Sequence, residues 1–231
     1  MKITLLLITL GIGTTILTGI SYLRKGKKTT KSGLKKAIAI NVVSILALFL
    51  MGLVPDIIIG DFDTVSPEIL KEYEDMENCR IIRLCPEKDD TDTESAINLA
   101  IREGFREIDV LGATGSRFDH TYANMFLLKK AYLQNVTLTF YTGLSKIYLI
   151  SGKKEYHPEN FFGTYISFLQ FDGNALGVTL SGFKYPLDNF DFDTTKTWRL
   201  GVSNEPVGTD AFVEVKSGCL LVVESLEDKK R

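Results

Sequence analysis

Three times between residues 56 and 120, a short apolar run is followed by a turn that is rich in Gly and Asp. The runs are DIII at 56–59, IIRLC at 81–85 and IDVL at 108–111. After the second and third turns, apolar residues recur at helical spacing, from near Asp92 and from about Thr121 to Gln134. Short strands that alternate with helices indicate a parallel sheet. We therefore expect an α/β fold with a ligand crevice at the carboxyl ends of its strands.

From Val136 onward the pattern changes to short β-prone runs that are separated by Gly, Asn, Asp and Pro. The runs are VTLTFYTG, KIYLIS, TYISFLQF, GVTLSGF and CLLVVESL. Short strands with frequent turn residues predict an antiparallel sandwich or barrel. We place the boundary near Gly143, which gives an α/β domain at 53–143 and an antiparallel β-sandwich domain at 144–231.

The first 55 residues differ from the rest in charge. They hold eight of the 27 basic residues and none of the 29 acidic ones, so the remainder carries 19 basic and 29 acidic residues. Residues 3–23 form an uncharged run long enough to span a bilayer as a helix, and a second apolar run covers 37–54. We expect residues 1–52 to form one or two membrane-like helices; a signal peptide or a buried core segment are the alternatives for the first run.

The orientation of the chain depends on the second run. If both apolar runs span the membrane, the basic loop between them is cytoplasmic and everything after Pro55 is exported. If only the first run spans, the acidic domain stays in the cytoplasm and residues 37–54 form a buried or interfacial helix. We expect a cytoplasmic catalytic domain that is anchored to the membrane through its N-terminal segment.

The first Gly- and Asp-rich turn, GDFDT at 60–64, follows an apolar strand directly. Asp61 and Asp63 point to the same side of an extended chain, where two carboxylates repel each other unless a cation lies between them. A hard cation such as Mg²⁺ is the natural partner of such a pair. A solvated Asp-rich turn is the alternative interpretation.

The second turn, KDDTD at 88–92, leads into a helix. Thr91 and Glu94 have the spacing of a capping box, which predicts a helix start near Asp92. The free backbone N–H groups of a helix N-terminus suit an anion. The aspartates are either caps or ligands of a metal that accompanies the anion, and capping explains only one of them well.

The third turn, GATGSRFDH at 112–120, combines glycines with Arg117, Asp119 and His120. Glycines let backbone amides approach a phosphate, and an arginine offers a fork of donors to phosphate oxygens. Asp119 either caps the following helix or holds metal, and His120 orients a neighbour. No GxxxxGK[ST] sequence occurs, which excludes a P-loop enzyme.

Composition excludes other classes of function. A formal charge of −2 without an arginine-rich tract argues against a nucleic-acid partner. Cys79, Cys85 and Cys219 are odd in number and lack metal-ligand spacing. We therefore expect reduced, buried thiols, as in a cytosolic protein.

Five motifs in register resemble the thiamine pyrophosphokinase (thiamine diphosphokinase) family. They are GDFDT at 60–64, KDDTD at 88–92, GATGSRFDH at 112–120 with Asn124 following, GFKYPL at 182–187 and GVSNE at 201–205. Each motif is modest alone, but the set spans about residues 53–231. The resemblance implies a Rossmann-like pyrophosphokinase domain followed by a thiamine-binding β-sandwich, and a homodimer. It implies an enzyme that uses ATP and thiamine to make thiamine diphosphate and AMP.

The resemblance also implies roles for individual residues. It implies an acidic catalytic set that holds Mg²⁺ and ATP: Asp61, Asp63, Asp89 and Asp92, with Asp61, Asp63 and Asp92 as metal ligands. It implies ATP contacts from Lys88, Thr91, Arg117, Asp119 and His120. It implies thiamine contacts from Ser203 and Asn204.

The front of the chain departs from the family pattern, in which a strand, a helix and an acidic Asp-Gly-Gly motif come first. No Asp-Gly-Gly occurs here, and residues 1–52 are apolar and basic. The pyrophosphokinase domain is therefore expected to be incomplete at its N-terminus. Two alternatives to an active enzyme follow: a degenerate or fused member that binds ligand without turnover, and a membrane protein with a passenger enzyme domain.

Overall fold

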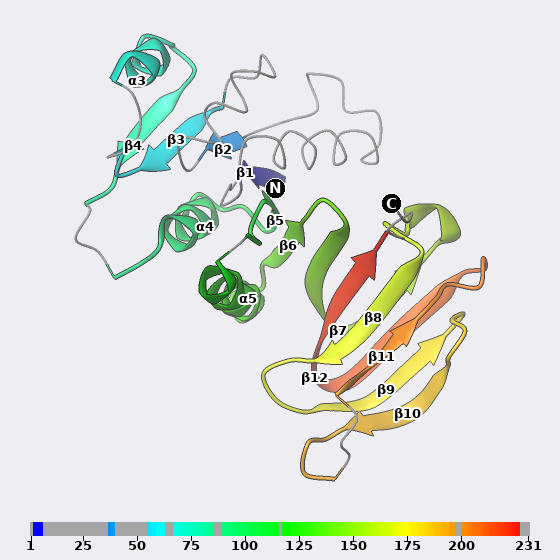
Figure 1. The fold of residues 1–231 in the computed structure, drawn as a ribbon. Helices are drawn as coiled ribbons and strands as arrows, with labels where there is room; N and C mark the ends of the chain where they lie inside the picture. The colour runs from blue at the N-terminus through cyan, green and yellow to red at the C-terminus, as the bar shows by residue number, and fades with distance from the viewer. Residues whose placement is uncertain are drawn as a thin grey trace. The chain divides into compact units, whose positions relative to one another are not determined.

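The computed structural model describes residues 2–6, 37–39, 55–62, 67–85, 89–115, 117–196 and 200–226. The chain divides into two compact units, Met1–Gly143 and Leu144–Arg231. Figure 1 shows helices and parallel strands in the first unit and a curved set of strands in the second. Each unit is described below by itself.

The first unit contains a parallel sheet with the strand order β6-β5-β1-β2-β3-β4. The strands are β1 (Lys2–Leu6), β2 (Ala37–Ala39), β3 (Ile57–Gly60), β4 (Arg80–Arg83), β5 (Glu107–Leu111) and β6 (Thr137–Tyr141). The helices are α3 (Pro67–Glu74), α4 (Asp92–Arg102) and α5 (Phe118–Tyr132). The α/β prediction for this region is therefore confirmed.

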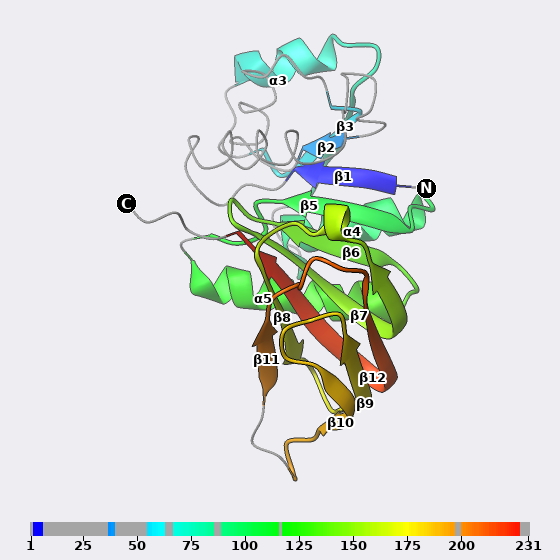
Figure 2. The same cartoon turned by 90° about the vertical axis from the view of Figure 1, so that its right-hand side faces the viewer.

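Strand β1 lies between β2 and β5, and all three strands run parallel (Figure 2). Thr4 pairs with Ala37 on one side and with Asp109 on the other. This arrangement corrects two expectations: residues 3–6 and 37–39 are strands of the sheet and not parts of membrane helices, and the domain does not lack a first strand. The sequence of a strand that is flanked on both sides in a parallel sheet is typically a continuous apolar run. Sequence periodicity cannot distinguish such a run from a buried helix.

The other residues of the two apolar runs, 7–23 and 40–54, lie outside the described residues. Within the described part of the chain, no helix combines the length and the apolar character that a membrane span requires. The expected membrane helices therefore find no support in the structure.

The second unit is built from antiparallel strands, as predicted. They are β7 (Ser145–Tyr156), β8 (Tyr165–Gln170), β9 (Ala175–Ser181), β10 (Leu187–Phe192), β11 (Gly201–Asn204) and β12 (Ala211–Ser225), with the short 3₁₀ helix η2 (Pro158–Asn160). The core of this unit is a cluster of 16 buried residues that all lie between Tyr148 and Val222.

Strand β12 pairs with β7 along its length and with two further strands in turn. Its first part pairs with β9 from Phe212 to Ser217, and its second part pairs with β8 from Leu220 to Ser225. The register shifts between Val215 and Leu220, where Gly218 has a φ of +85°. A side chain at Gly218 would collide with the Asn174 carbonyl oxygen, so the kink needs glycine. The strand therefore changes its partner from β9 to β8 at this irregularity.

Candidate functional site

The strand order of the first unit reverses at β1. The chain runs outward through β2, β3 and β4, then returns to place β5 on the other side of β1. In open parallel sheets, ligands bind outside the carboxyl ends of the strands at such a reversal. The loop after β5, described at 112–115 and 117, begins at the carboxyl end of a strand that flanks this reversal, and Asp61 follows the carboxyl end of β3.

The loop after β5 is fastened to α5 by two buried or half-buried polar side chains. Asn124 is buried, and its Nδ2 donates a hydrogen bond of 2.8 Å to the Ala113 carbonyl oxygen. The Thr121 Oγ1 accepts from the Gly115 N–H at 3.0 Å. These contacts fix the loop before any ligand binds. Asn124 was given no role from the sequence; a polar residue at a buried position of a helix is the signal that could have revealed it.

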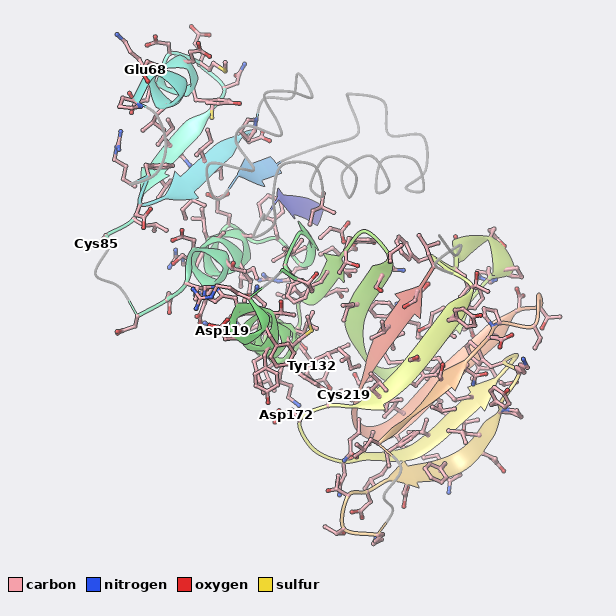
Figure 3. The ribbon with its side chains drawn as sticks, viewed as in Figure 1. Glu68, Cys85, Asp119, Tyr132, Asp172 and Cys219 are labelled. Carbon is pink, nitrogen blue, oxygen red and sulfur yellow. The ribbon has the colours of Figure 1, made fainter. Side chains whose placement is uncertain are left out.

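Arg117 and Asp119 form an exposed ion pair at the start of α5. Arg117 Nε and Nη2 lie 3.2 and 2.5 Å from the two Asp119 carboxylate oxygens. This hydrogen bonding raises the pKa of the Arg117 guanidinium and lowers the pKa of the Asp119 carboxyl. Figure 3 shows Asp119 on the surface of α5. Both side chains are charged and reach solvent, so a phosphate can compete with Asp119 for Arg117.

The helix α5 begins at Phe118, three residues earlier than expected, and Arg117 is the N-cap residue without a side-chain cap. Asp119 therefore does not cap the helix; it lies in the first turn, where a carboxylate is favourable to the helix dipole. His120 Nε2 lies 3.9 Å from an Asp119 carboxylate oxygen, beyond hydrogen-bond distance, and the orienting role expected for His120 stays a prediction.

The start of α4 agrees with the prediction from the capping box. The helix begins at Asp92, and the Thr91 side chain accepts a hydrogen bond of 3.2 Å from the Glu94 N–H. Asp90 accepts from the Asn98 side chain at 3.2 Å, and Glu94 pairs with Lys130 of α5 at 2.7 Å. Capping thus accounts for Thr91, and Asn98 binds Asp90. Asp89 is exposed just before the helix.

The proposed metal ligands are only partly described. Asp61 is half-buried after β3, and Asp92 is half-buried at the start of α4, whereas Asp63 and Lys88 lie outside the described residues. Among the residues that the structure does describe, no group of three His, Cys, Asp or Glu side chains is arranged to hold a metal ion. Carboxylate oxygens nevertheless match the hard ligands that Mg²⁺ prefers, so the donor chemistry fits this ion.

The two residues of the fifth motif have opposite surroundings in the second unit. Ser203 is exposed on β11, whereas Asn204 is buried with 1% of its surface exposed. Asn204 Oδ1 accepts from the Tyr185 N–H at 2.9 Å and from the Glu205 N–H at 3.0 Å, and its Nδ2 donates to the Tyr185 carbonyl at 2.7 Å. Asn204 therefore holds the turn at 184–186, and Ser203 is the member that a ligand can reach.

The cysteines are free thiols, but only Cys219 is buried. Cys79 is half-buried, and burial raises its pKa to about 11, which makes it a poor nucleophile. Cys85 is exposed after β4 (Figure 3), so the expectation that all three are buried is correct for Cys219 and wrong for Cys79 and Cys85.

Two family models match the chain in series. The "Thiamin pyrophosphokinase, catalytic domain" matches residues 43–140, and the "Thiamin pyrophosphokinase, vitamin B1 binding domain" matches residues 150–220. Thiamine pyrophosphokinase of Bacillus subtilis (strain 168) is 28% identical over 183 residues, which cover 76% of this chain and 81% of the relative. Thiamine pyrophosphokinase 1 of Oryza sativa subsp. japonica is 29% identical over 144 residues, or 58% of this chain and 53% of the rice protein.

Solved structures share the fold. The crystal structure of the Bacillus subtilis thiamine pyrophosphokinase superposes with a TM-score of 0.79 at 23% identity and covers 98% of this chain and 100% of its own. The yeast thiamin pyrophosphokinase gives a TM-score of 0.71 at 19% identity, with 99% and 87% covered. With both domains matched in order and the motif residues at strand ends and helix starts, the chain belongs to the thiamine pyrophosphokinase family.

Proposed function

We propose that this chain is a thiamine pyrophosphokinase that transfers the pyrophosphoryl group of ATP to the hydroxyl oxygen of thiamine and releases AMP. The observation that carries the proposal is the match of both family models in series, the catalytic one at 43–140 and the vitamin B1 binding one at 150–220. The loop at the strand-order reversal supports it, because this is where a nucleotide binds in parallel sheets.

We assign ATP to residues 53–143 and thiamine to residues 144–231. Arg117 is the phosphate-binding group of the loop after β5, because the Gly115 and Gly112 N–H groups already donate to Thr121 and to the Tyr141 carbonyl. Lys88, Thr91, Asp119 and His120 complete the proposed ATP contacts. Ser203 contacts thiamine directly, and Asn204 acts on thiamine through the turn that it holds.

The acidic residues Asp61, Asp63, Asp89 and Asp92 provide the negative charge for a divalent cation, with Asp61, Asp63 and Asp92 as its ligands. Bound Mg²⁺ would neutralise the phosphate oxygens and orient them. In the transfer, the thiamine oxygen attacks the β-phosphorus while the bond from this phosphorus to the oxygen that bridges it to the α-phosphorus breaks. One of the carboxylates accepts the hydroxyl proton. Positioning and charge neutralisation supply most of such catalysis.

We also propose that the enzyme is a homodimer and works in the cytoplasm, where ATP is available.

The surface that we assign to the second copy is an aromatic stripe on α5 formed by Phe118, Tyr122 and Phe126, which are 76%, 57% and 43% exposed. Their ring centroids are 6.1 and 5.2 Å apart in sequence order. In a two-fold dimer the same surface of each copy meets its counterpart, and the exposed rings supply apolar area for such a contact. Tyr122→Ser should convert the dimer to monomers in light scattering, and an unchanged mass would exclude this surface.

The test of the proposed activity is formation of AMP and thiamine diphosphate from ATP, thiamine and Mg²⁺ by the full chain. Asp63→Asn should lower turnover at least about 100-fold through loss of a metal ligand. Asp75→Asn, the same change at an exposed residue after α3, should stay within about twofold of the parent. A folded chain that forms no product would instead support the alternative of a family member without turnover.

A further inference from the structure

Ser203 and Ser167 lie side by side on neighbouring strands of the second unit. Strand β11 pairs antiparallel with β8, and in this register Ser203 is directly opposite Ser167. Residues that are directly opposite each other point to the same face and have Cβ atoms about 4.5–5.5 Å apart. Both serines point away from the core of the unit, because their neighbours along each strand are buried: Val202 and Asn204 on β11, and Ile166 and Phe168 on β8.

The hydroxyl groups of these two serines are not used by the protein itself. In the ranges that the structure describes, neither the Ser203 nor the Ser167 side chain makes a hydrogen bond. A second pair on the same face behaves differently, since the hydroxyl oxygens of Ser145 and Ser225 lie 3.2 Å apart and bind each other. Ser203 and Ser167 therefore remain available to a ligand, whereas Ser145 and Ser225 form a structural contact.

An apolar surface adjoins the two free hydroxyl groups. Gly201, two residues before Ser203, is opposite Leu169 of β8. The Leu169 Cδ2 lies 2.5 Å from the place that a Gly201 Cβ would occupy, so the leucine side chain lies over the glycine. On the other side of β8, the half-buried Val223 of β12 is opposite Ser167. A flat ring on this face would contact aliphatic carbons and present its edge to the two hydroxyl groups.

The chemistry of thiamine decides which part of it fits this pair. The hydroxyethyl oxygen must reach the β-phosphorus of ATP, and the thiazolium ring is a cation without hydrogen-bonding groups. The aminopyrimidine is a flat ring whose edge carries an amino donor beside a ring-nitrogen acceptor. A serine hydroxyl both donates and accepts, so two neighbouring hydroxyl groups can satisfy both positions of this edge.

We infer that Ser167 is a specificity-determining residue that binds, together with Ser203, the polar edge of the thiamine aminopyrimidine. The inference rests on the proposed function, which assigns thiamine to the second unit through Ser203. One hydroxyl group accepts from the amino group, and the other donates to the ring nitrogen. The aminopyrimidine takes no part in the transfer, so the Ser167 hydroxyl contributes to the affinity for thiamine and not to the turnover of the bound substrate.

The decisive comparison is between Ser167→Thr and Ser167→Val in the full chain. The two new side chains have the same shape and both suit a strand, but only threonine keeps the hydroxyl group. Equilibrium dialysis measures the dissociation constant of thiamine. The Thr variant should bind thiamine within about threefold of the parent, and the Val variant at least about tenfold more weakly. In both variants kcat and the KM for ATP should stay within about twofold of the parent.

A thiamine analogue and a control on the same face complete the test. An analogue with a phenyl ring in place of the aminopyrimidine has no polar edge, so it should bind the Thr and Val variants equally. Ser225→Ala removes a hydroxyl group whose partner is Ser145, and the dissociation constant of thiamine should stay within about twofold of the parent.

Equal affinities of the Thr and Val variants for thiamine would overturn the inference. It would also be overturned if the phenyl analogue distinguished the two variants as strongly as thiamine does, or if the parent did not bind thiamine. Product formation by the parent would leave the proposed function standing in each case. A parent that binds thiamine through Ser167 but forms no product would refute the proposed function alone.

Discussion

Ser203 and Asn204 are neighbours in one motif, but Ser203 is exposed to a ligand and Asn204 is buried and stabilises a turn. On a strand, successive side chains point to opposite faces, so one reaches solvent while the other enters the protein. The buried amide of Asn204 makes three hydrogen bonds with Tyr185 and Glu205. The sequence placed both residues in the same site, but it could not show which of them is exposed to a ligand.

The two residues should respond differently to the same substitution. Ser203→Ala should raise the KM for thiamine more than the KM for ATP and leave the thermal midpoint unchanged. Asn204→Ala should lower the free energy of unfolding by about 1–3 kcal/mol, because the Tyr185 N–H and carbonyl lose their buried partner. Steady-state kinetics and urea unfolding measure the two effects. A Ser203→Ala variant with a selective change in the KM for ATP would contradict the assignment.

Lys154 offers a test of electrostatics at the residue scale. Its ammonium lies 4.1 Å from the centroid of the buried Tyr148 ring, and burial lowers its pKa to about 8, with Lys146 acting in the same direction. The unfolded chain keeps this proton up to about pH 10.5. Between these two values the unfolded state holds more protons, so this residue makes native stability rise with pH.

Lys154→Met should therefore change how stability depends on pH. At pH 7 Lys154 is charged in the native state, and the half-burial of this charge lowers the free energy of unfolding. By pH 9.5 the native side chain is mostly neutral, so most of this loss of stability has disappeared. We expect the stability difference between parent and variant to shift in favour of the parent across this interval, as measured by urea unfolding at both values. Lys153→Met, at the exposed neighbouring position, should show a constant difference. A constant difference for Lys154→Met would show that burial does not control this charge.

At the scale of elements, the sequence predicted best where a local rule decides the structure. The start of α4 follows from Thr91 and Glu94, because a cap is a contact between near neighbours. The start of α5 was placed three residues late, since no side chain caps it. Strand β1 was missed because its partners, β2 and β5, lie some 30 and 100 residues away along the chain. Local periodicity contains no information about such partners.

The position of β1 predicts a large effect from a single proline. Thr4→Pro removes an N–H from a strand that is paired on both sides, a place where proline is essentially not found. We expect loss of the cooperative unfolding transition of the first unit, or a fall in its midpoint by more than about 10 °C. Circular dichroism during heating would measure the change.

The matched control is Thr4→Val, which keeps a β-branched side chain and the backbone donor, and should unfold like the parent. If Thr4→Pro left the first unit equally stable, residues 2–6 would not be part of its sheet. The expectation of a separate N-terminal segment would then regain support.

At the scale of the whole molecule, the second unit has a core and a buried polar network of its own. The core cluster of the second unit consists only of residues of that unit. A buried polar group accompanies it: Glu224 is 1% exposed and accepts hydrogen bonds from Lys146 at 3.0 Å, Tyr148 at 2.8 Å and the Phe162 N–H at 2.7 Å. The carboxylate is thus fully satisfied within the unit.

A fragment of residues 144–231 should therefore fold alone. We expect a cooperative urea transition and a near-ultraviolet dichroism signal from its packed aromatic rings. Within the fragment, Glu224→Ala should cost about 3–5 kcal/mol, because it leaves Lys146 and two buried donors without their acceptor. A fragment without a cooperative transition would show that the second unit depends on the first.

The pairing of β12 with three earlier strands has a consequence for how the chain is made. Strand β12 pairs with β7, β8 and β9, and it follows all of them along the sequence. During synthesis, these strands leave the ribosome before the one strand that joins them, and their unpaired edges stay open until then. The second unit therefore closes only after Ser225 has emerged, and until that moment the open strand edges can pair with other chains.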